Sequence, residues 1–187
     1  MIVVGASMGG LRALITVLGG MPRTFSIPLA VVLHRHKDSD GMLLELLQRN
    51  QPLPALEPVD KEPILPGRVY LAPADYHLLV EPSHFCLSID DPVRYARPSI
   101  DVLFESAADA FGPETTALIL TGANADGAHG AARIKARGGR VIVQDPATAE
   151  APQMPQAVLD MMKPDCILPL EHIAAHLLQL TGKTYES

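Results

Sequence analysis

Hydrophobic positions along the first fifty residues follow two kinds of pattern. Residues 2–4 and 29–33 are short, unbroken apolar runs, which are typical of strands that are covered on both faces of a sheet. From Leu11 onward, apolar residues recur at i, i+3, i+4 and i+7, which predicts a helix that ends near Gly19. A second helix is predicted over about 41–49. This order of elements indicates a βαβα unit whose first two strands are parallel.

The middle of the chain has a different pattern. Residues 52–91 are rich in proline and contain three strand-like runs, at 68–72, 76–80 and 85–89. The runs are separated by only about three to five residues, which is too short for a crossover helix. We therefore expect them to pair as antiparallel hairpins, and we interpret this region as an insertion on one edge of the sheet.

The alternation of strands and helices returns after Pro98. The further predicted helices cover about 98–111, 127–137, a segment from 155 onward and 171–180, and the further predicted strands cover 116–121, 140–144 and 166–168. The predicted fold class is α/β, a doubly wound, mostly parallel sheet with helices on both faces and an antiparallel hairpin insertion. We expect residues 1–187 to form a single domain.

Composition limits the classes of function. Hydrophobic residues make up 48% of the chain and charged residues 19%, as in globular proteins. The formal net charge of −6 argues against nucleic acid as a general partner. Cys86 and Cys166 form no Cys-x-x-Cys pair, so neither a disulfide framework nor a thiolate zinc site is expected. No secretory signal or membrane-spanning run is evident, so we predict a cytoplasmic protein without membrane insertion.

Polar residues follow the predicted parallel strands at the points where ligands collect in such sheets. Ser7 follows the first strand, His34 the second, and Asp126 lies in the loop after the strand at 116–121. A hydroxyl, an imidazole and a carboxylate at one sheet edge are the three parts of a nucleophile, a base and an orienting anion. Glycines around Ser7 allow a sharp turn and close approach of a substrate.

Each of these residues also has a simpler interpretation. Ser7 could cap a helix N-terminus, Asp126 could cap the helix that begins near Gly127, and His34 could be a buried core histidine. His36 is a competing base, and a metal site built on the two histidines lacks a further ligand at a recognisable spacing, so no metal is expected.

A nucleotide-binding loop is a further alternative. Gly5-x-Ser7-x-x-Gly10 is a degenerate dinucleotide-binding pattern, but the acidic residue that should confirm it after the second strand is absent. The Walker Gly-Lys-Ser/Thr motif is absent as well. We therefore expect no cofactor.

Several short motifs occur together and in order. They are Gly5-Ala6-Ser7-x-Gly9-Gly10, the strand-end His34, the segment 67–73 with His77, the segment 97–104, Thr121-Gly122-x-x-x-Asp126-Gly127, and Gln144-Asp145 with Met154-Pro155. Over about residues 1–180 the sequence resembles the catalytic domain of the chemotaxis protein-glutamate methylesterase family, CheB. The joint order and spacing of these motifs make the resemblance specific.

The resemblance implies a serine hydrolase that removes methyl esters from glutamate side chains and in some members deamidates glutamines. Its implied partners are the methylated cytoplasmic helices of chemoreceptors, within a possible larger signalling assembly. At the matching positions Ser7 is the nucleophile, His34 the general base and then acid, and Asp126 its partner. For the oxyanion we expect backbone N–H groups of Met8 and of the Gly122-Ala123 loop.

The sequence departs from the family pattern in three places. The usual family chain carries an N-terminal receiver domain, which is not present in this sequence. The family's Gln-His-x-Pro motif reads Leu33-His34-Arg35-His36, and its Thr-Gly-Met loop reads Thr121-Gly122-Ala123. These departures leave two alternatives open, an esterase or amidase acting on another protein or small ester, and a catalytically silent signalling or scaffold domain.

Overall fold

A seven-stranded parallel sheet forms the centre of the computed structural model, which describes residues 1–36 and 41–180. The single-domain prediction therefore also covers residues 37–40 and 181–187, which lie outside the described residues. In spatial order the strands are β3 (Ala55–Leu56), β4 (Val69–Leu71), β2 (Leu29–Leu33), β1 (Ile2–Ala6), β7 (Thr116–Ile119), β8 (Arg140–Gln144) and β9 (Cys166–Leu168). The sheet is open and doubly wound, which confirms the predicted fold class.

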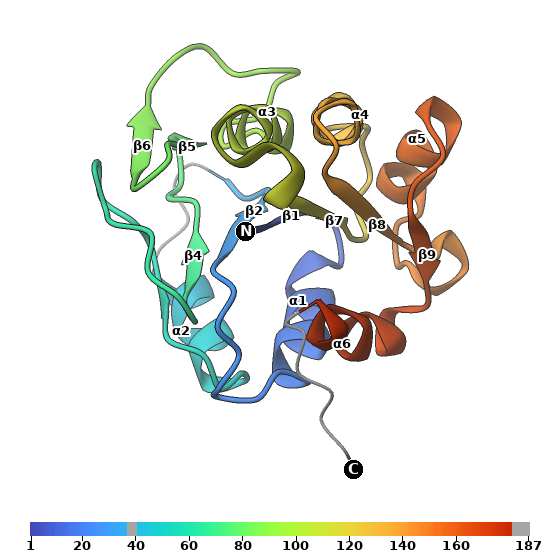
Figure 1. Cartoon of the computed structure of the whole chain (residues 1–187), viewed down its shortest axis with the longest axis horizontal. Coiled ribbons are helices and arrows are strands. Elements are labelled where there is room, and N and C mark those ends of the chain that lie inside the picture. Colours follow the sequence, from blue (N-terminus) through green and yellow to red (C-terminus); the bar gives the residue numbers. More distant parts are fainter. Residues whose placement is uncertain (37–40, 181–187) are drawn as a thin grey trace.

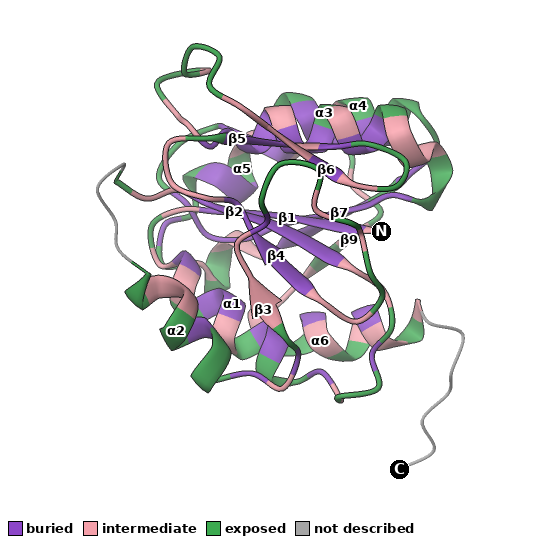
Figure 2. Cartoon of the chain, turned by 90° about the vertical axis from the view of Figure 1, so that its left-hand side faces the viewer, coloured by how far each residue is buried: buried purple, intermediate pink, exposed green. Residues whose placement is uncertain are grey.

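Helices cover both faces of this sheet, as Figures 1 and 2 show. One face carries α1 (Gly10–Gly19), α2 (Met42–Arg49) and α6 (Leu170–Gln179), and the other carries α3 (Ile100–Phe111), α4 (Ala128–Ala136) and α5 (Gln153–Met161). Two 3₁₀ turns, η1 (Gly112–Glu114) and η2 (Pro146–Thr148), complete the connections. Because alternate side chains of the central strands point to opposite faces, the sheet separates two buried apolar cores. None of the described helices has the length and apolar character needed to cross a membrane.

The predicted strands at 29–33, 140–144 and 166–168 are confirmed with the same bounds. The prediction that the run at 68–72 belongs to an antiparallel hairpin is wrong. Its core, β4, pairs in parallel with β2 and β3, and all of its side chains are buried, as in the other central strands. The predicted helix α2 leads from β2 to the short strand β3, and residues 57–68, which contain no helix, form the parallel connection from β3 to β4.

The antiparallel part of the insertion is smaller than predicted. β5 (His77–Val80) and β6 (Phe85–Ser88) form a separate two-stranded sheet. It packs beside α3 through Leu78, Val80 and Phe85, which belong to the core on that face.

The strand order reverses at β1, and this reversal creates the crevice in which ligands of open α/β sheets bind. From β1 the chain continues to β2 and β4 on one side, whereas β7, β8 and β9 lie on the other side. The helices that follow β1 and β7 leave on opposite faces, because α1 lies below the sheet and α4 above it in Figure 1. The loops after β1, β2 and β7 therefore surround one opening at the carboxyl ends of adjacent strands.

Candidate active site

Ser7 occupies the turn between β1 and α1. Its backbone N–H donates to the carbonyl of Thr121 at 3.0 Å, and its carbonyl accepts from Gly10 at 2.8 Å. Gly9 has φ of 74°, a left-handed conformation that favours glycine, and it is the N-cap residue of α1. The alternative that Ser7 caps this helix is therefore wrong. The Ser7 hydroxyl has no hydrogen-bond partner among the described residues, and the side chain is half-buried at the opening.

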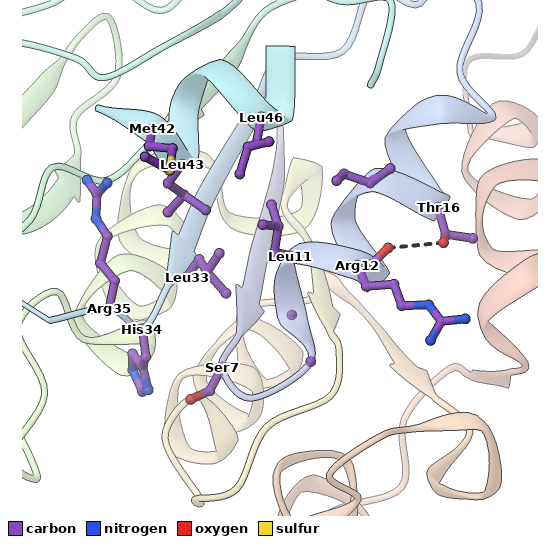
Figure 3. Close-up of a pocket in the computed structure, with 13 residues that line it drawn as sticks. Ser7, Leu11, Arg12, Thr16, Leu33, His34, Arg35, Met42, Leu43 and Leu46 are labelled. Carbon is purple, nitrogen blue, oxygen red and sulfur yellow. Dashed lines mark hydrogen bonds between the residues drawn. The ribbon is translucent and has the colours of Figure 1, made fainter. Parts of the chain in front are cut away.

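The register of the sheet places His34 beside Ser7. Ala6 pairs with Leu33 in the parallel ladder, and the backbone N–H of His34 donates to the carbonyl of Ala6 at 3.0 Å. Ser7 and His34, the residues that directly follow the two strands, therefore enter the same opening. Figure 3 shows the Ser7 hydroxyl extending toward the side of the cavity on which His34 lies. The His34 side chain is only 13% exposed.

Asp126 is held by four hydrogen bonds. Its Oδ1 accepts from the Ser99 hydroxyl and the Asp101 N–H, each at 3.0 Å. Its Oδ2 accepts from the Ile100 N–H at 2.7 Å and from Nε2 of His34 at 2.8 Å. The carboxylate thus caps α3, whereas Gly127 is the N-cap residue of α4 and has no side-chain cap. Asp126 therefore caps a helix, as the simpler interpretation expected, but this helix is α3 and not α4.

The hydrogen bonds to Asp126 decide its charge state. Burial alone raises the pKa of this carboxyl, since the side chain is nearly inaccessible to water. The hydrogen bond from His34 and the backbone N–H groups of Ile100 and Asp101 outweigh burial, so the net pKa lies below its usual value. Asp126 is therefore an anion that can orient the imidazole and stabilise its cation.

The His34 ring presents its two nitrogens to different groups. Nε2 faces Asp126, while Nδ1 lies 3.0 Å from Nδ2 of Asn124. Nδ1 is consequently the ring nitrogen that does not contact Asp126. His36, the competing base, is exposed and lines a neighbouring cavity, whereas the anion pairs with His34.

The backbone donors expected near Ser7 differ in their availability. Gly122 donates its N–H to the carbonyl of Ala151 at 2.9 Å, so this N–H is already used within the protein. The N–H groups of Met8 and Ala123 have no partner within the described residues. Thr121 fixes the turn, because its hydroxyl lies 2.9 Å from the carbonyl of Met8. Met8 and Ala123 are thus the two candidate donors for an oxyanion.

Two cavities meet at Ser7 and His34. The first, of about 720 Å³, opens between α1 and α2 (Figure 3). Its apolar lining consists of Leu11, Ile15, Leu33, Met42, Leu43 and Leu46. The second, of about 580 Å³, lies on the other side of the two residues and is lined in part by Arg94, Arg97 and Asn124. A substrate at Ser7 therefore has an apolar wall on one side and a polar wall on the other.

Nothing in the described part of the chain gathers three or more histidine, cysteine, aspartate or glutamate side chains in a way that could hold a metal ion. Nε2 of His34 contacts the carboxylate of Asp126.

Sequence reasoning did not assign a role to several residues that organise the site. Ser99 lies within the recognised segment 97–104, and it supports Asp126. Buried His77 in turn accepts the Ser99 backbone N–H at Nδ1 and lies 3.2 Å from the carbonyl of Asp91 through Nε2. Asn124 carried no pattern that would have singled it out, because its contacts depend on the folded loop.

Known proteins are similar to this chain in sequence and in fold. The sequence profile of the CheB methylesterase family matches residues 2–177. The crystal structure of the Thermotoga maritima CheB methylesterase catalytic domain has a TM-score of 0.93 and 34% identity, and the match covers 96% of this chain and 97% of that one. A Leptospira interrogans protein, provisionally named protein-glutamate methylesterase/protein-glutamine glutaminase, is 42% identical over 99% of this chain and 96% of its own length.

Other relatives are longer than this chain. A Rhodospirillum rubrum protein named protein-glutamate methylesterase/protein-glutamine glutaminase 1 is 37% identical over 97% of this chain but only 49% of its own length. The Myxococcus xanthus protein-glutamate methylesterase FrzG is 38% identical over 96% of this chain and 54% of its own length. The chain thus spans nearly all of one relative and about half of these two.

Proposed function

The chain belongs to the CheB methylesterase family, and from this premise we propose that it hydrolyses methyl esters of glutamate side chains in proteins. Ser7 is the nucleophile, His34 the general base and acid, and Asp126 the orienting anion. The observation that carries this proposal is the 2.8 Å hydrogen bond between Nε2 of His34 and the charged carboxylate of Asp126. This carboxylate accepts four hydrogen bonds in all. The other ring nitrogen, Nδ1, lies 3.0 Å from Nδ2 of Asn124, and through this nitrogen His34 would accept the proton of Ser7.

Acylation begins with the Ser7 hydroxyl. Nδ1 of His34 accepts its proton while Oγ attacks the ester carbonyl carbon, and the carbonyl π electrons move onto oxygen. The resulting oxyanion is positioned to accept from the free N–H groups of Met8 and Ala123. As the tetrahedral intermediate collapses, the bond to methoxide breaks and the proton on Nδ1 passes to it, so that methanol leaves.

Deacylation repeats these steps with water. Nδ1 removes a proton from water as its oxygen attacks the acyl-enzyme, and the same proton then returns to Oγ of Ser7. The products are the free serine and a glutamic acid side chain, which releases its proton to water and becomes a carboxylate. Asp126 stabilises the imidazolium during both steps without itself accepting the proton. A glutamine side chain would follow the same course with ammonia as the leaving group, which agrees with the second activity in the name of the Rhodospirillum rubrum relative.

The natural substrates in this proposal are methylated cytoplasmic helices of chemoreceptors. Support comes from the family and from the names of the relatives, which specify protein glutamate as the group acted on. The apolar cavity beside Ser7 offers a wall for the methylene groups and the methyl ester of such a side chain. We also propose that residues 1–187 act as a single catalytic domain.

Methanol release from methylated receptor helices tests this function. The wild-type protein should release methanol, and Ser7→Ala should abolish release while leaving the thermal unfolding curve unchanged, since it removes one oxygen at a half-buried position. Retained turnover in Ser7→Ala would refute the mechanism. Preference for small esters over receptor helices would favour another substrate, and a wild-type Ser7 that a fluorophosphonate does not label would indicate a silent signalling domain.

A further inference from the structure

Asn124 connects two members of the catalytic group. Its Oδ1 accepts the backbone N–H of Asp126 at 3.1 Å, and its Nδ2 lies 3.0 Å from Nδ1 of His34. The first contact fixes the orientation of the amide, because a backbone N–H can only donate and must face the oxygen. The NH₂ group therefore faces the imidazole.

This orientation determines the tautomer of His34. An amide NH₂ only donates, so Nδ1 must be the ring nitrogen that accepts and carries no proton. Nε2 then carries the proton and donates it to the anion Asp126, in agreement with the contact at 2.8 Å. Two independent neighbours, one on each nitrogen, thus select the same neutral form.

The same contact has a cost for catalysis. Nδ1 has a single lone pair, and in this structure it is directed to the Asn124 amide, whereas the Ser7 hydroxyl has no partner among the described residues. Asn124 and Ser7 must therefore compete for the atom that removes the proton of the nucleophile. Asn124 is exposed on its loop, so its amide can be displaced without unpacking the core.

We propose that Asn124 caps the catalytic base of the free enzyme. The amide holds Nδ1 of His34 in the accepting form and keeps it from Ser7, and a bound substrate displaces the amide and releases the lone pair to the serine. The cap makes the nucleophile less reactive toward small electrophiles than toward a substrate large enough to reach the second cavity, which Asn124 helps to line. This inference rests on the proposed function, because it concerns the same base and nucleophile.

Labelling kinetics measure the cap directly. The second-order rate constant for fluorophosphonate labelling of Ser7 refers to the free enzyme and so includes the cost of uncapping. Asn124→Ala should raise this constant by about 2- to 10-fold, the range expected for loss of one neutral hydrogen bond. Ala125→Ser, an exposed substitution next to it in the loop, should leave the constant unchanged. An unchanged or lower constant in Asn124→Ala overturns the proposal, and a loss of about 10²-fold or more would instead make Asn124 an oxyanion donor.

A second variant retains the contact to the backbone. Asn124→Asp keeps an acceptor for the Asp126 N–H, but its carboxylate cannot donate to Nδ1. A negative charge at this distance should hold a proton on Nδ1 and block the base, so labelling near neutral pH should fall well below the wild-type rate. Wild-type labelling in Asn124→Asp would contradict the proposed contact.

Nitrogen-15 NMR of the histidine rings separates failure of the cap from failure of the function. The wild-type His34 should show a pyridine-type Nδ1 and a pyrrole-type Nε2, with the signals assigned by their loss in His34→Gln. Asn124→Ala should move the Nδ1 resonance in the direction of a lost hydrogen bond and leave the tautomer unchanged. A protonated Nδ1 in the wild type, or no shift in Asn124→Ala, overturns the proposal even if the enzyme is active. If wild-type Ser7 is never labelled, the proposed function fails and this spectrum alone decides the cap.

Discussion

Oδ2 of Asp126 lies 2.7 Å from the backbone nitrogen of Ile100, the first residue of α3. The anion that pairs with the His34 imidazole is therefore bound at the N-terminus of a helix from a distant part of the sequence. Free N–H groups and the helix dipole both favour a negative charge at this point. The proposed catalytic group and the N-terminus of α3 thus share Asp126, and changes in this residue should affect stability and activity together.

Asp126→Asn should lower the free energy of unfolding near neutral pH by about 3 kcal/mol. The amide has one acceptor oxygen, whereas the carboxylate accepts from four donors in the folded protein. Although burial raises the pKa of Asp126, hydrogen bonds from His34 and the backbone hold the net pKa below its usual value. Its stabilising effect is thus complete above the unfolded pKa of about 3.9 and is lost as the pH falls through the lower folded pKa.

Denaturant titrations of wild type and Asp126→Asn at a series of pH values test this expectation. The difference in stability should be constant above about pH 5 and shrink below about pH 4. A difference that grows toward acid pH would show that the folded carboxyl has a raised pKa instead.

The same variant should lose about 10⁴-fold in the rate of methyl ester hydrolysis, as expected when the orienting anion of a serine triad becomes an amide. Wherever the amide NH₂ replaces Oδ2, Nε2 of His34 must accept rather than donate, and the proton moves to Nδ1. That proton would face both Ser7 and the NH₂ group of Asn124. Single-turnover rates on the folded variant measure the effect, and a nearly wild-type rate would reduce Asp126 to a cap of α3.

Ser99→Ala separates support of the carboxylate from general packing. It removes one donor to Oδ1 of Asp126 and leaves the contacts of Oδ2 to His34 and Ile100. We expect a loss of about 1 kcal/mol in stability. We also expect a fall in rate of less than about 10-fold, because the imidazole retains its partner.

Ser106→Ala is the matched control for this change. The Ser106 hydroxyl also connects two elements, since it accepts from the Val80 N–H and donates to the carbonyl of Leu103, but it does not contact the site. Its stability loss should be similar while the rate is unchanged. Equal rates in both variants would show that Ser99 has no influence on the catalytic group.

The sequence was sufficient to predict the outline of the fold and the meeting of three side chains at one sheet edge. Unbroken apolar runs and helical periodicity mark most elements, and the rule for open α/β sheets predicts that Ser7, His34 and Asp126 lie at the same edge. β4 was misassigned because a three-residue apolar strand next to hairpin signals has no periodicity that separates parallel from antiparallel pairing.

The remaining details depend on contacts between distant segments. The use of the Gly122 N–H by Ala151, which leaves Met8 and Ala123 as the candidate oxyanion donors, follows from the approach of two loops. The cap of α3 by Asp126 likewise joins residues about 25 positions apart, beyond the local patterns by which sequence signals identify helix caps. These contacts form only when the sheet edge is assembled, so a local pattern could not reveal them.

Gly122 leaves little room for a side chain beside Ser7. A Cβ atom at Gly122 would lie 2.5 Å from Cε of Met154 and 3.0 Å from Cβ of Ser7. Met154 has a flexible end that can move, but Ser7 is fixed by its backbone hydrogen bonds to Thr121 and Gly10. Gly122→Ala should therefore displace the nucleophile and lower the rate by about 10²-fold, since a shift of the order of 1 Å has an effect of this size.

Gly41→Ala is the control for this substitution. No heavy atom of residues 1–36 or 41–180 lies within 4 Å of a Cβ at this position, and its φ of −67° is suitable for alanine. This variant should keep the wild-type rate, and because Gly41 is the N-cap residue of α2, where alanine is less favourable than glycine, it should be equally or slightly less stable, by up to about 1 kcal/mol. The double variant Gly122→Ala with Met154→Ala removes the contact with the methionine and keeps the one with Ser7, and the single variant Met154→Ala measures the cost of the lost core packing. If the double variant restores the wild-type rate, Met154 and not Ser7 accounts for the loss, and the close approach of Gly122 to the nucleophile has no catalytic consequence.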